Sequence, residues 1–217
     1  MTRPDLRAAL RWYGVTRAGI PSSDALAAEV SAGLRGGLTA VQLRQKEALA
    51  PAERALRALA LVHCCRALGA LSIINDDVEL ALSAGADGVH LGASDGCWAE
   101  ARRVLGPERV LGATVRSVEQ ALRAQAAGAD YVGVGPIFDA RDSKEDAEAP
   151  LGVGVLRSLR EHPDLRTIPI VAIGGIDPAR ARQCFSAGAD GVAAIRGFFG
   201  GEDVRAGVAA FVQAATV

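Results

Sequence analysis

The chain has 217 residues, 50% of them hydrophobic, and a formal net charge of −1 at pH 7. This length can bury one large hydrophobic core, so we expect residues 1–217 to form a single domain. The near-neutral charge gives no indication of nucleic acid or an anionic membrane as a partner. No apolar run approaches the roughly 18 residues of a membrane span, and the four cysteines form no C-x-x-C pair, which indicates a soluble enzyme of the reducing cytoplasm.

Short apolar runs alternate with helical stretches along the whole chain. The predicted strands are residues 12–15, 40–43, 71–74, 88–91, 110–113, 131–135, 170–173 and 191–195. The predicted helices are residues 24–34, 51–68, 77–83, 98–105, 118–127, 153–161, 178–186 and 204–215. Strand–helix units repeated in this way without a linker predict an α/β fold, the (β/α)8 TIM barrel. An open doubly wound sheet is the alternative, but no G-x-G-x-x-G motif opens the first unit.

The phrase Gly-Ala-Asp recurs where a predicted helix gives way to a strand, at Gly85, Gly128 and Gly188. Glycine reaches positive φ without steric cost and is therefore the usual residue just past a helix end. We predict that each of these glycines ends a helix and that the chain turns directly into a buried strand.

Residues 72–95 form the most informative strand–helix–strand unit. Its two strands are expected to be parallel neighbours, about 4.8 Å apart, because a short helix joins them. Asp76 and Asp95 then follow the carboxyl ends of these strands, where they could hold a divalent cation between them. Alternatively, each aspartate only caps the helix that follows it, and Asp76-x-x-Glu79 resembles a capping box.

In a barrel of this type the chemistry lies at the carboxyl ends of the strands, which share one rim. The residues that would meet there are Gln42, Arg44, Lys46, Asn75, Asp76, Asp95, Thr114, Lys144, Gly174, Gly175, Ile195 and Arg196. Lys46 and Lys144 are the two lysines among 24 basic residues, and a compact ammonium suits a phosphate as a point charge. The rim therefore suits a diphosphate carried with Mg²⁺. Gly174-Gly175 would suit a phosphate monoester held by backbone N–H groups.

Structural alternatives remain for these residues. Gln42 and Arg44 could fill a polar layer inside the barrel, and Gly174-Gly175 could be turn glycines alone. His90 lies inside a predicted strand and is expected to be a hydrogen-bonded interior residue rather than a base. No Ser-His-Asp or Cys-His arrangement is predicted at the rim, which argues against acyl transfer.

Several independent motifs, in the same order along the chain, resemble one protein family. They are VQLRQK at residues 41–46, NDD at 75–77, GADGVHLGASD at 85–95, GADYVGVGPIF at 128–138 and VAIGGI at 171–176. Together they resemble the thiamine phosphate synthase (thiamine-phosphate pyrophosphorylase) family. The resemblance implies a TIM barrel that condenses 4-amino-2-methyl-5-hydroxymethylpyrimidine diphosphate with thiazole phosphate. Thiamine phosphate and pyrophosphate would form by a dissociative, Mg²⁺-assisted mechanism.

The resemblance also implies functions for individual residues. The implied catalytic residues are Arg44, Lys46 and Lys144. The implied ligands of the pyrimidine diphosphate are Gln42, Arg44, Lys46, Asn75 and Lys144, with Thr114 on the pyrimidine and Ser143 as a further substrate contact. Mg²⁺ would bind to Asp76 and Asp95. Backbone amides of Gly175 and Ile195 would bind the thiazole phosphate.

The chain departs from the family's pattern mainly on the thiazole side. Residues 139–144 (DARDSK) stand where the family usually reads Pro-Thr-x-Thr-Lys, and Arg196 replaces a serine. We predict that Arg196 grips the thiazole phosphate; alternatively, it points outward and pairs with Glu202 or Asp203. The competing functions are a thiazole tautomerase-like enzyme and a non-catalytic phosphate-ligand-binding barrel. The sequence leaves the oligomeric state open, a homodimer included.

Overall fold

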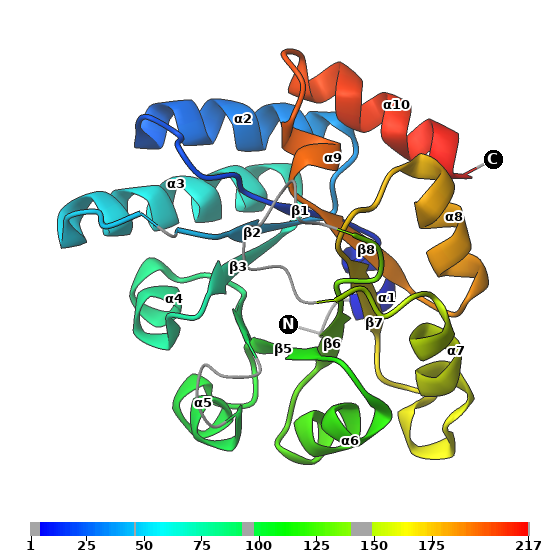
Figure 1. Ribbon diagram of the computed structural model, residues 1–217. Coiled ribbons are helices and arrows are strands. Elements are labelled where there is room, and N and C mark those ends of the chain that lie inside the picture. The colour runs from blue at the N-terminus through cyan, green and yellow to red at the C-terminus, as the bar shows by residue number, and fades with distance from the viewer. Residues whose placement is uncertain (1–4, 46, 93–97, 140–148, 217) are drawn as a thin grey trace.

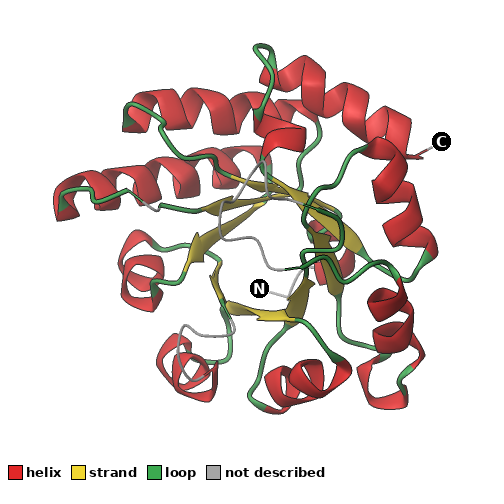
Figure 2. Cartoon of the chain, in the orientation of Figure 1, coloured by secondary structure: helices red, strands yellow, loops and turns green. Residues whose placement is uncertain are grey.

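A computed structural model of the chain describes residues 5–45, 47–92, 98–139 and 149–216. Eight parallel strands form a closed barrel in the order of the sequence, and helices surround it (Figures 1 and 2). The strands are β1 Trp12–Val15, β2 Ala40–Leu43, β3 Leu71–Asn75, β4 Gly88–Leu91, β5 Val110–Val115, β6 Tyr131–Val134, β7 Ile170–Ile173 and β8 Gly191–Ala194. The predicted (β/α)8 TIM barrel is confirmed, and the open doubly wound sheet is excluded.

The outer layer contains the helices that the sequence predicts, and each observed end lies within two residues of the predicted one. They are α2 Ser23–Gly36, α3 Pro51–Leu68, α4 Val78–Ala84, α5 Trp98–Leu105, α6 Val118–Ala126, α7 Gly154–Glu161, α8 Pro178–Ser186 and α10 Val204–Thr216. Three short elements were not predicted, namely α1 Leu6–Ala9, the 3₁₀ turn η1 Pro163–Leu165 and α9 Arg196–Phe199. None of these three is long enough to show a helical period in the sequence.

Serine and aspartate side chains fix where several outer helices begin. Ser22 accepts a hydrogen bond from Ala25 N, Asp77 from Leu80 N, Ser117 from Gln120 N and Asp177 from Arg180 N. Each cap satisfies a backbone N–H group that the first turn of a helix leaves without a partner. Because β3, β5 and β7 are followed within a few residues by Asp77, Ser117 and Asp177, these caps also fix how the chain leaves the rim.

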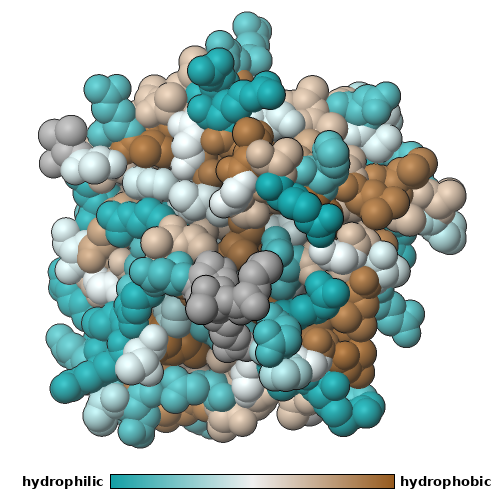
Figure 3. All heavy atoms as spheres, turned by 180° about the vertical axis from the view of Figure 1, so that it is seen from behind, coloured by the Kyte–Doolittle hydropathy of each residue, from teal (hydrophilic) through white to brown (hydrophobic). Residues whose placement is uncertain are grey.

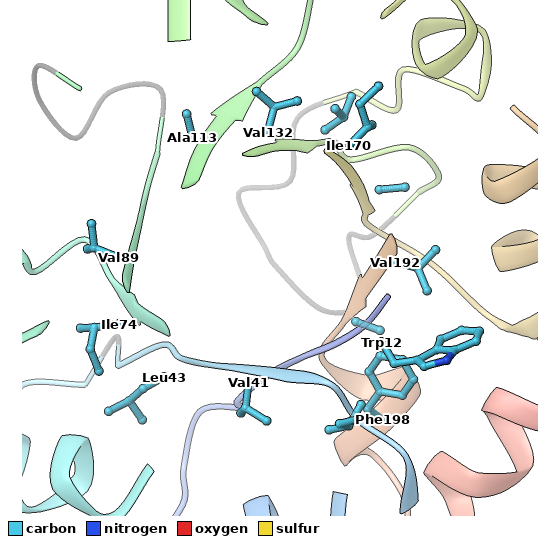
Figure 4. Packing of buried hydrophobic residues seen from close by; sticks show 14 of the residues in the cluster. Trp12, Val41, Leu43, Ile74, Val89, Ala113, Val132, Ile170, Val192 and Phe198 are labelled. Atoms are coloured by element: carbon cyan, nitrogen blue, oxygen red, sulfur yellow. The ribbon is translucent and has the colours of Figure 1, made fainter. Parts of the chain in front are cut away.

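The main hydrophobic core lies between the strands and the outer helices. Figure 4 shows side chains such as Val41, Leu43 and Ile74 on the outer side of the ring of strands. Side chains alternate in direction along a strand, so the residues between these ones point into the barrel. This alternation directs Gln42 and Ile73 inward.

A second hydrophobic cluster fills the inside of the barrel. Its members are Leu10, Tyr13, Val15, Ala40, Leu71, Ile73, Val110, Tyr131, Val171 and Ala193. Leu6 and Ala9 of α1 pack against this cluster, and Leu10 just after α1 is fully buried. The short helix α1 therefore covers the end of the barrel at which the strands begin.

The side of the molecule turned away from the view of Figure 1 is a mosaic of hydrophilic and hydrophobic side chains (Figure 3). None of the described helices is both long and apolar enough to cross a membrane.

The structure confirms that the glycine of each Gly-Ala-Asp repeat lies at a helix end, and it shows that the aspartate of each repeat bonds to a neighbouring strand. Gly85, Gly128 and Gly188 have φ values of 69°, 91° and 101°. Each aspartate accepts a hydrogen bond from the first or second residue of the preceding strand in the barrel: Asp87 from Ser72 N at 2.9 Å, Asp130 from Leu111 N at 2.8 Å and Asp190 from Ile170 N at 2.8 Å. The repeated aspartates thus join successive units at the amino-terminal end of the barrel.

Arginines from the outer helices complete two of these junctions. Arg102 pairs with Asp130 and donates to the carbonyl oxygens of Gly128, Gly106 and Arg109. Arg160 pairs with Asp190 in the same way and donates to Gly188 O. The Asp130 side chain is 9% exposed and that of Arg102 is 19% exposed, so this pair is far better shielded from water than a surface pair.

Replacing Asp130 should therefore destabilise the fold without touching the rim. We expect Asp130→Ala to lower the free energy of unfolding by about 2–4 kcal/mol. The substitution removes the carboxylate partner of Arg102, which keeps only its carbonyl acceptors, and it removes the acceptor of Leu111 N. Glu119→Ala is the matched control, because Glu119 pairs with Arg123 at 3.7 Å on the exposed surface of α6 and should contribute no more than about 1 kcal/mol. Urea denaturation measures both, and equal losses would contradict the structural function of Asp130.

Candidate active site at the carboxyl ends of the strands

The closed barrel brings the described rim residues to one end, because all eight strands are parallel. Those residues are Gln42 and Arg44 at the end of β2, Asn75 and Asp76 at β3, Thr114 in β5, Gly175 after β7, and Ile195 and Arg196 after β8. Four predicted site residues lie outside the described residues: Lys46, Asp95, Ser143 and Lys144.

Asp76 has a left-handed backbone conformation, with φ of 63°, and it is the only non-glycine residue with positive φ among the described residues. That conformation costs a residue with a Cβ atom roughly 1–2 kcal/mol, and such strain gathers at functional sites. The helix cap is the next residue, since Asp77 Oδ1 accepts from Leu80 N at 2.8 Å. The alternative that Asp76 caps the helix is therefore wrong.

The Asp76 carboxylate is exposed at the rim, beside the half-buried Asn75. Asn75 Nδ2 donates a hydrogen bond to Asp76 Oδ2. Carboxylate and amide oxygens are ligands that Mg²⁺ accepts, so the chemistry of this pair fits the expected metal. Within residues 5–45, 47–92, 98–139 and 149–216, no group of three or more His, Cys, Asp or Glu is placed to hold a metal ion, and Asp95 lies outside these ranges.

The end of β2 holds one buried and one half-buried polar residue. Gln42 is 6% exposed and its Nε2 donates to Tyr13 Oη at 2.9 Å, so the expectation of an interior polar layer is correct for its amide nitrogen. Arg44 is half-buried, and its backbone N donates to Thr16 Oγ1 at 2.9 Å. The backbone from which the Arg44 side chain extends is thus bonded to the residue that follows β1.

A continuous chain of hydrogen bonds crosses the inside of the barrel below the rim. Gln42 Nε2 bonds to Tyr13 Oη, Tyr13 Oη to Tyr131 Oη, Tyr131 Oη to His90 Nδ1, and His90 Nε2 to Thr114 Oγ1, each at 2.9 Å. We call these five residues the floor chain. They come from β2, β1, β6, β4 and β5. The prediction that His90 is a hydrogen-bonded interior residue is confirmed.

The two tyrosines of the floor chain are acids too weak to ionise at neutral pH. Both are fully buried, and burial raises the pKa of Tyr13 and Tyr131 far above the usual value for tyrosine. The two hydroxyl groups therefore act as hydrogen-bonding groups that each keep their proton.

Two glycines make room for the floor chain. A Cβ atom at Gly112 would lie 2.2 Å from Tyr131 Cζ and 2.5 Å from His90 Nδ1, and one at Gly133 would lie 2.9 Å from His90 Cε1. Any side chain at Gly112 would push apart the two partners of the central hydrogen bond. No local sequence pattern predicts this requirement, because the clash involves residues of three different strands.

The Gly174-Gly175 turn after β7 requires glycine at both positions. Gly174 and Gly175 have φ values of 103° and 62°, and a Cβ atom at Gly175 would lie 2.3 Å from Asp139 O. Arg180 Nη1 donates to Gly175 O at 2.7 Å, which fixes the turn to α8. Within the described part of the chain, Gly175 N donates no hydrogen bond, so its N–H group remains for a ligand.

The segment after β8 differs in one respect from the sequence prediction. The strand ends at Ala194, Ile195 occupies the N-cap position of α9, and Arg196 is the first residue of that helix. The Arg196 side chain is exposed rather than buried in the barrel wall. This position places Arg196 just past the carboxyl end of β8.

Arg116, the residue after β5, donates hydrogen bonds to the backbone at both ends of the segment that follows β6. Its Nη1 donates to Gly135 O at 3.1 Å and its Nη2 to Ala149 O at 3.0 Å. Gly135 and Ala149 flank the residues that include Ser143 and Lys144, so Arg116 fixes the two points from which that segment starts and returns.

Comparisons with known proteins give a consistent result. A family model described as thiamine monophosphate synthase matches residues 12–198. The chain is 43% identical over 196 residues to the thiamine-phosphate synthase of Chloroflexus aurantiacus, covering 90% of this chain and 88% of that protein. It is 44% identical over 211 residues to the thiamine biosynthesis bifunctional protein ThiM/ThiE of Symbiobacterium thermophilum, which is 97% of this chain but only 42% of that protein. The solved thiamine phosphate pyrophosphorylase of Pyrococcus furiosus is 33% identical with a TM-score of 0.83, covering 98% of both chains.

The left-handed conformation of Asp76 predicts opposite effects for two adjacent substitutions. Asp76→Gly should leave the free energy of unfolding unchanged or raise it by up to about 1 kcal/mol, because glycine relieves the backbone strain. Asp77→Ala should lower it by about 1 kcal/mol, because it removes the cap. Thermal unfolding measures both, and Mg²⁺ titration of each variant should show weaker binding for Asp76→Gly alone. A stability loss on Asp76→Gly that matches the loss on Asp77→Ala would contradict the assignment.

Proposed function

The chain belongs to the thiamine monophosphate synthase family, and we propose that it condenses 4-amino-2-methyl-5-hydroxymethylpyrimidine diphosphate with a thiazole phosphate. The products are thiamine phosphate and pyrophosphate. The observation that carries this proposal is the extent of the family match. Residues 12–198 contain all eight strands and every residue proposed for the site, from Gln42 to Arg196.

The pyrimidine ring binds above the floor chain. Gln42 and Thr114 are the two ends of that chain, and each lies one residue before the carboxyl end of its strand. The apolar cluster beneath, with Tyr13 and Tyr131, supports a flat ring and keeps water from its lower face.

The diphosphate binds along the ends of β2 and β3. The Arg44 guanidinium supplies a charge-assisted, bidentate contact, and Asn75 supplies an amide donor. Lys46 and Lys144 add two compact charges to the same group. Together these residues neutralise the charge that grows on the diphosphate as it departs, which is the main catalytic contribution available at this rim.

Asp76 and Asp95 would hold Mg²⁺ beside the diphosphate. When bound, the ion supplies further positive charge that stabilises the leaving pyrophosphate. The strained, exposed Asp76 supports this proposal, because the conformation is retained at a cost and the capping task falls to Asp77.

The thiazole phosphate binds at the opposite part of the rim, between the turn after β7 and the start of α9. Gly175 and Ile195 offer backbone N–H groups and Arg196 a charge-assisted contact. Ser143, which precedes Lys144 in the sequence, is a further proposed substrate contact. Together these contacts orient the thiazole nitrogen toward the methylene carbon of the pyrimidine.

The reaction is dissociative in this proposal. The bond between the methylene carbon and the diphosphate oxygen breaks, and its electron pair leaves with the pyrophosphate. The methylene cation that remains is stabilised by the aminopyrimidine ring, and the lone pair of the thiazole nitrogen forms the new carbon–nitrogen bond. The protein mainly positions both partners and stabilises the leaving group.

We place this activity in the cytoplasm, where small phosphorylated substrates and Mg²⁺ are available, and we propose a homodimer as the assembly. Two other functions compete with it. A thiazole tautomerase-like enzyme would act on the thiazole alone, and a non-catalytic barrel would bind phosphate ligands without joining them.

Pyrophosphate release distinguishes these functions directly. We expect release only when the pyrimidine diphosphate, the thiazole phosphate and Mg²⁺ are all present, with thiamine phosphate formed in equal amount. Arg44→Ala should lower kcat/KM for the pyrimidine diphosphate about 10- to 150-fold, the equivalent of one charge-assisted contact. Arg103→Ala is the matched control, because Arg103 is paired with Glu100 on the exposed face of α5. Tautomerisation, or binding without pyrophosphate release, would overturn the proposal.

The contribution of Arg196 can be separated from that of the diphosphate site. Arg196→Ala should weaken binding of the thiazole phosphate at least about tenfold, because a charge-assisted contact is lost. Binding of the pyrimidine diphosphate should hardly change. Arg205→Ala, an exposed arginine of α10, controls for the loss of one positive charge. Calorimetric titration with each substrate measures both affinities, and an equal loss for the two substrates would refute the assignment.

A further inference from the structure

The floor chain has a direction that is set at one end. In the structure the Gln42 amide presents Nε2 to Tyr13 Oη, and an amide nitrogen only donates, so Tyr13 Oη accepts from it. Each tyrosine hydroxyl carries one hydrogen, so that of Tyr13 goes to Tyr131 Oη, at 2.9 Å. The hydrogen of Tyr131 then goes to His90 Nδ1, also at 2.9 Å.

This order determines which nitrogen of His90 carries the proton. Because Nδ1 accepts from Tyr131, a neutral imidazole holds its hydrogen on Nε2 and donates it to Thr114 Oγ1. Tyr13 is 2% exposed and Tyr131 0%, so water does not reach their hydroxyls to offer another donor or acceptor. A charged imidazolium would need Tyr131 Oη to accept, and the hydrogen of one of the two tyrosine hydroxyls would then have no partner in the interior.

The chain ends leave two polar groups for the rim. Thr114 Oγ1 already accepts from His90, so its own hydrogen remains as a donor. Gln42 uses Nε2 for Tyr13, and its Oε1 accepts no hydrogen bond from the residues that the structure describes, so this oxygen remains as an acceptor. The floor chain thus has one hydrogen-bond acceptor at its β2 end and one donor at its β5 end.

We propose that the floor chain sets the polarity of the pyrimidine site, so that Thr114 donates to a ring nitrogen while Gln42 Oε1 accepts from the amino group. Tyr13, Tyr131 and His90 are positioning residues that act through Thr114. This proposal rests on the function proposed above and deepens it. A heteroaromatic ring with an amino group next to a ring nitrogen fits this order of acceptor and donor. In a ring with the two groups exchanged, the amino group would face the Thr114 donor and the ring nitrogen would face the Gln42 acceptor.

The clearance at Gly112 and Gly133 supports an ordered chain. A methyl group at either position would collide with His90, and at Gly112 with the Tyr131 ring as well. β5 and β6 therefore have glycine where the His90 imidazole and the Tyr131 ring pack, and the close packing holds the hydrogen bond between these two side chains in one geometry.

The tautomer of His90 can be measured in the free protein, independently of any activity. We expect nitrogen-15 NMR of the neutral imidazole to show the hydrogen on Nε2 and none on Nδ1. Spectra of His63→Gln and His162→Gln identify the His90 signals, since these are the other two histidines. A hydrogen on Nδ1, or an exchanging mixture of tautomers, would overturn the proposal even if the enzyme turns over as proposed.

A double-mutant cycle tests whether the buried tyrosine acts through Thr114. Thr114→Val and Tyr131→Phe should each raise KM for the pyrimidine diphosphate about five- to tenfold, the equivalent of one hydrogen bond, with little change in KM for the thiazole phosphate. The double variant should lose no more than Thr114→Val alone, because both changes remove the same oriented donor. Multiplied losses would refute it. Thr167→Val, at an exposed threonine of the loop before β7, controls for the substitution itself.

Discussion

Closure of eight parallel strands in sequence order is the constraint on which the other features depend. A parallel closed sheet gives the molecule two unlike ends, because every strand begins at one end and finishes at the other. At the amino-terminal end, the repeated aspartates and the arginines of α5 and α7 bond to backbone groups of successive units. At the carboxyl end lie the polar residues proposed for ligand binding, among them Gln42, Arg44 and Asn75. Stability and chemistry are thus separated along the barrel axis.

The interior of the barrel joins these two ends through a balance of large and small residues. Two tyrosines and a histidine occupy the middle of the barrel, and glycines on β5 and β6 leave the space that they need. The hydrogen bonds of the floor chain satisfy groups that would be costly to bury alone. A rigid, polar floor can therefore lie directly above an apolar cluster, and the ligand site gains fixed donors and acceptors without access of water from below.

The sequence predicted the long elements because their apolar periods are local, and eight strands and eight helices lie within a few residues of their expected positions. The sequence suggested Asp76 as an alternative cap of the following helix, but Asp77 is the cap, and only the backbone conformation reveals this. The short helices α1 and α9 have no period to detect. Tyr13 and Tyr131 are 118 residues apart in sequence, and their contact follows only from the closed order of the strands.

The most direct test of this account is a crystal structure of the protein with thiamine phosphate, pyrophosphate and Mg²⁺ bound. The account predicts the pyrimidine ring between Gln42 and Thr114, the pyrophosphate beside Arg44, Asn75 and Asp76, and the phosphate of the product at Gly175 and Arg196. A pyrimidine ring away from both ends of the floor chain, or pyrophosphate at the turn after β7, would contradict it.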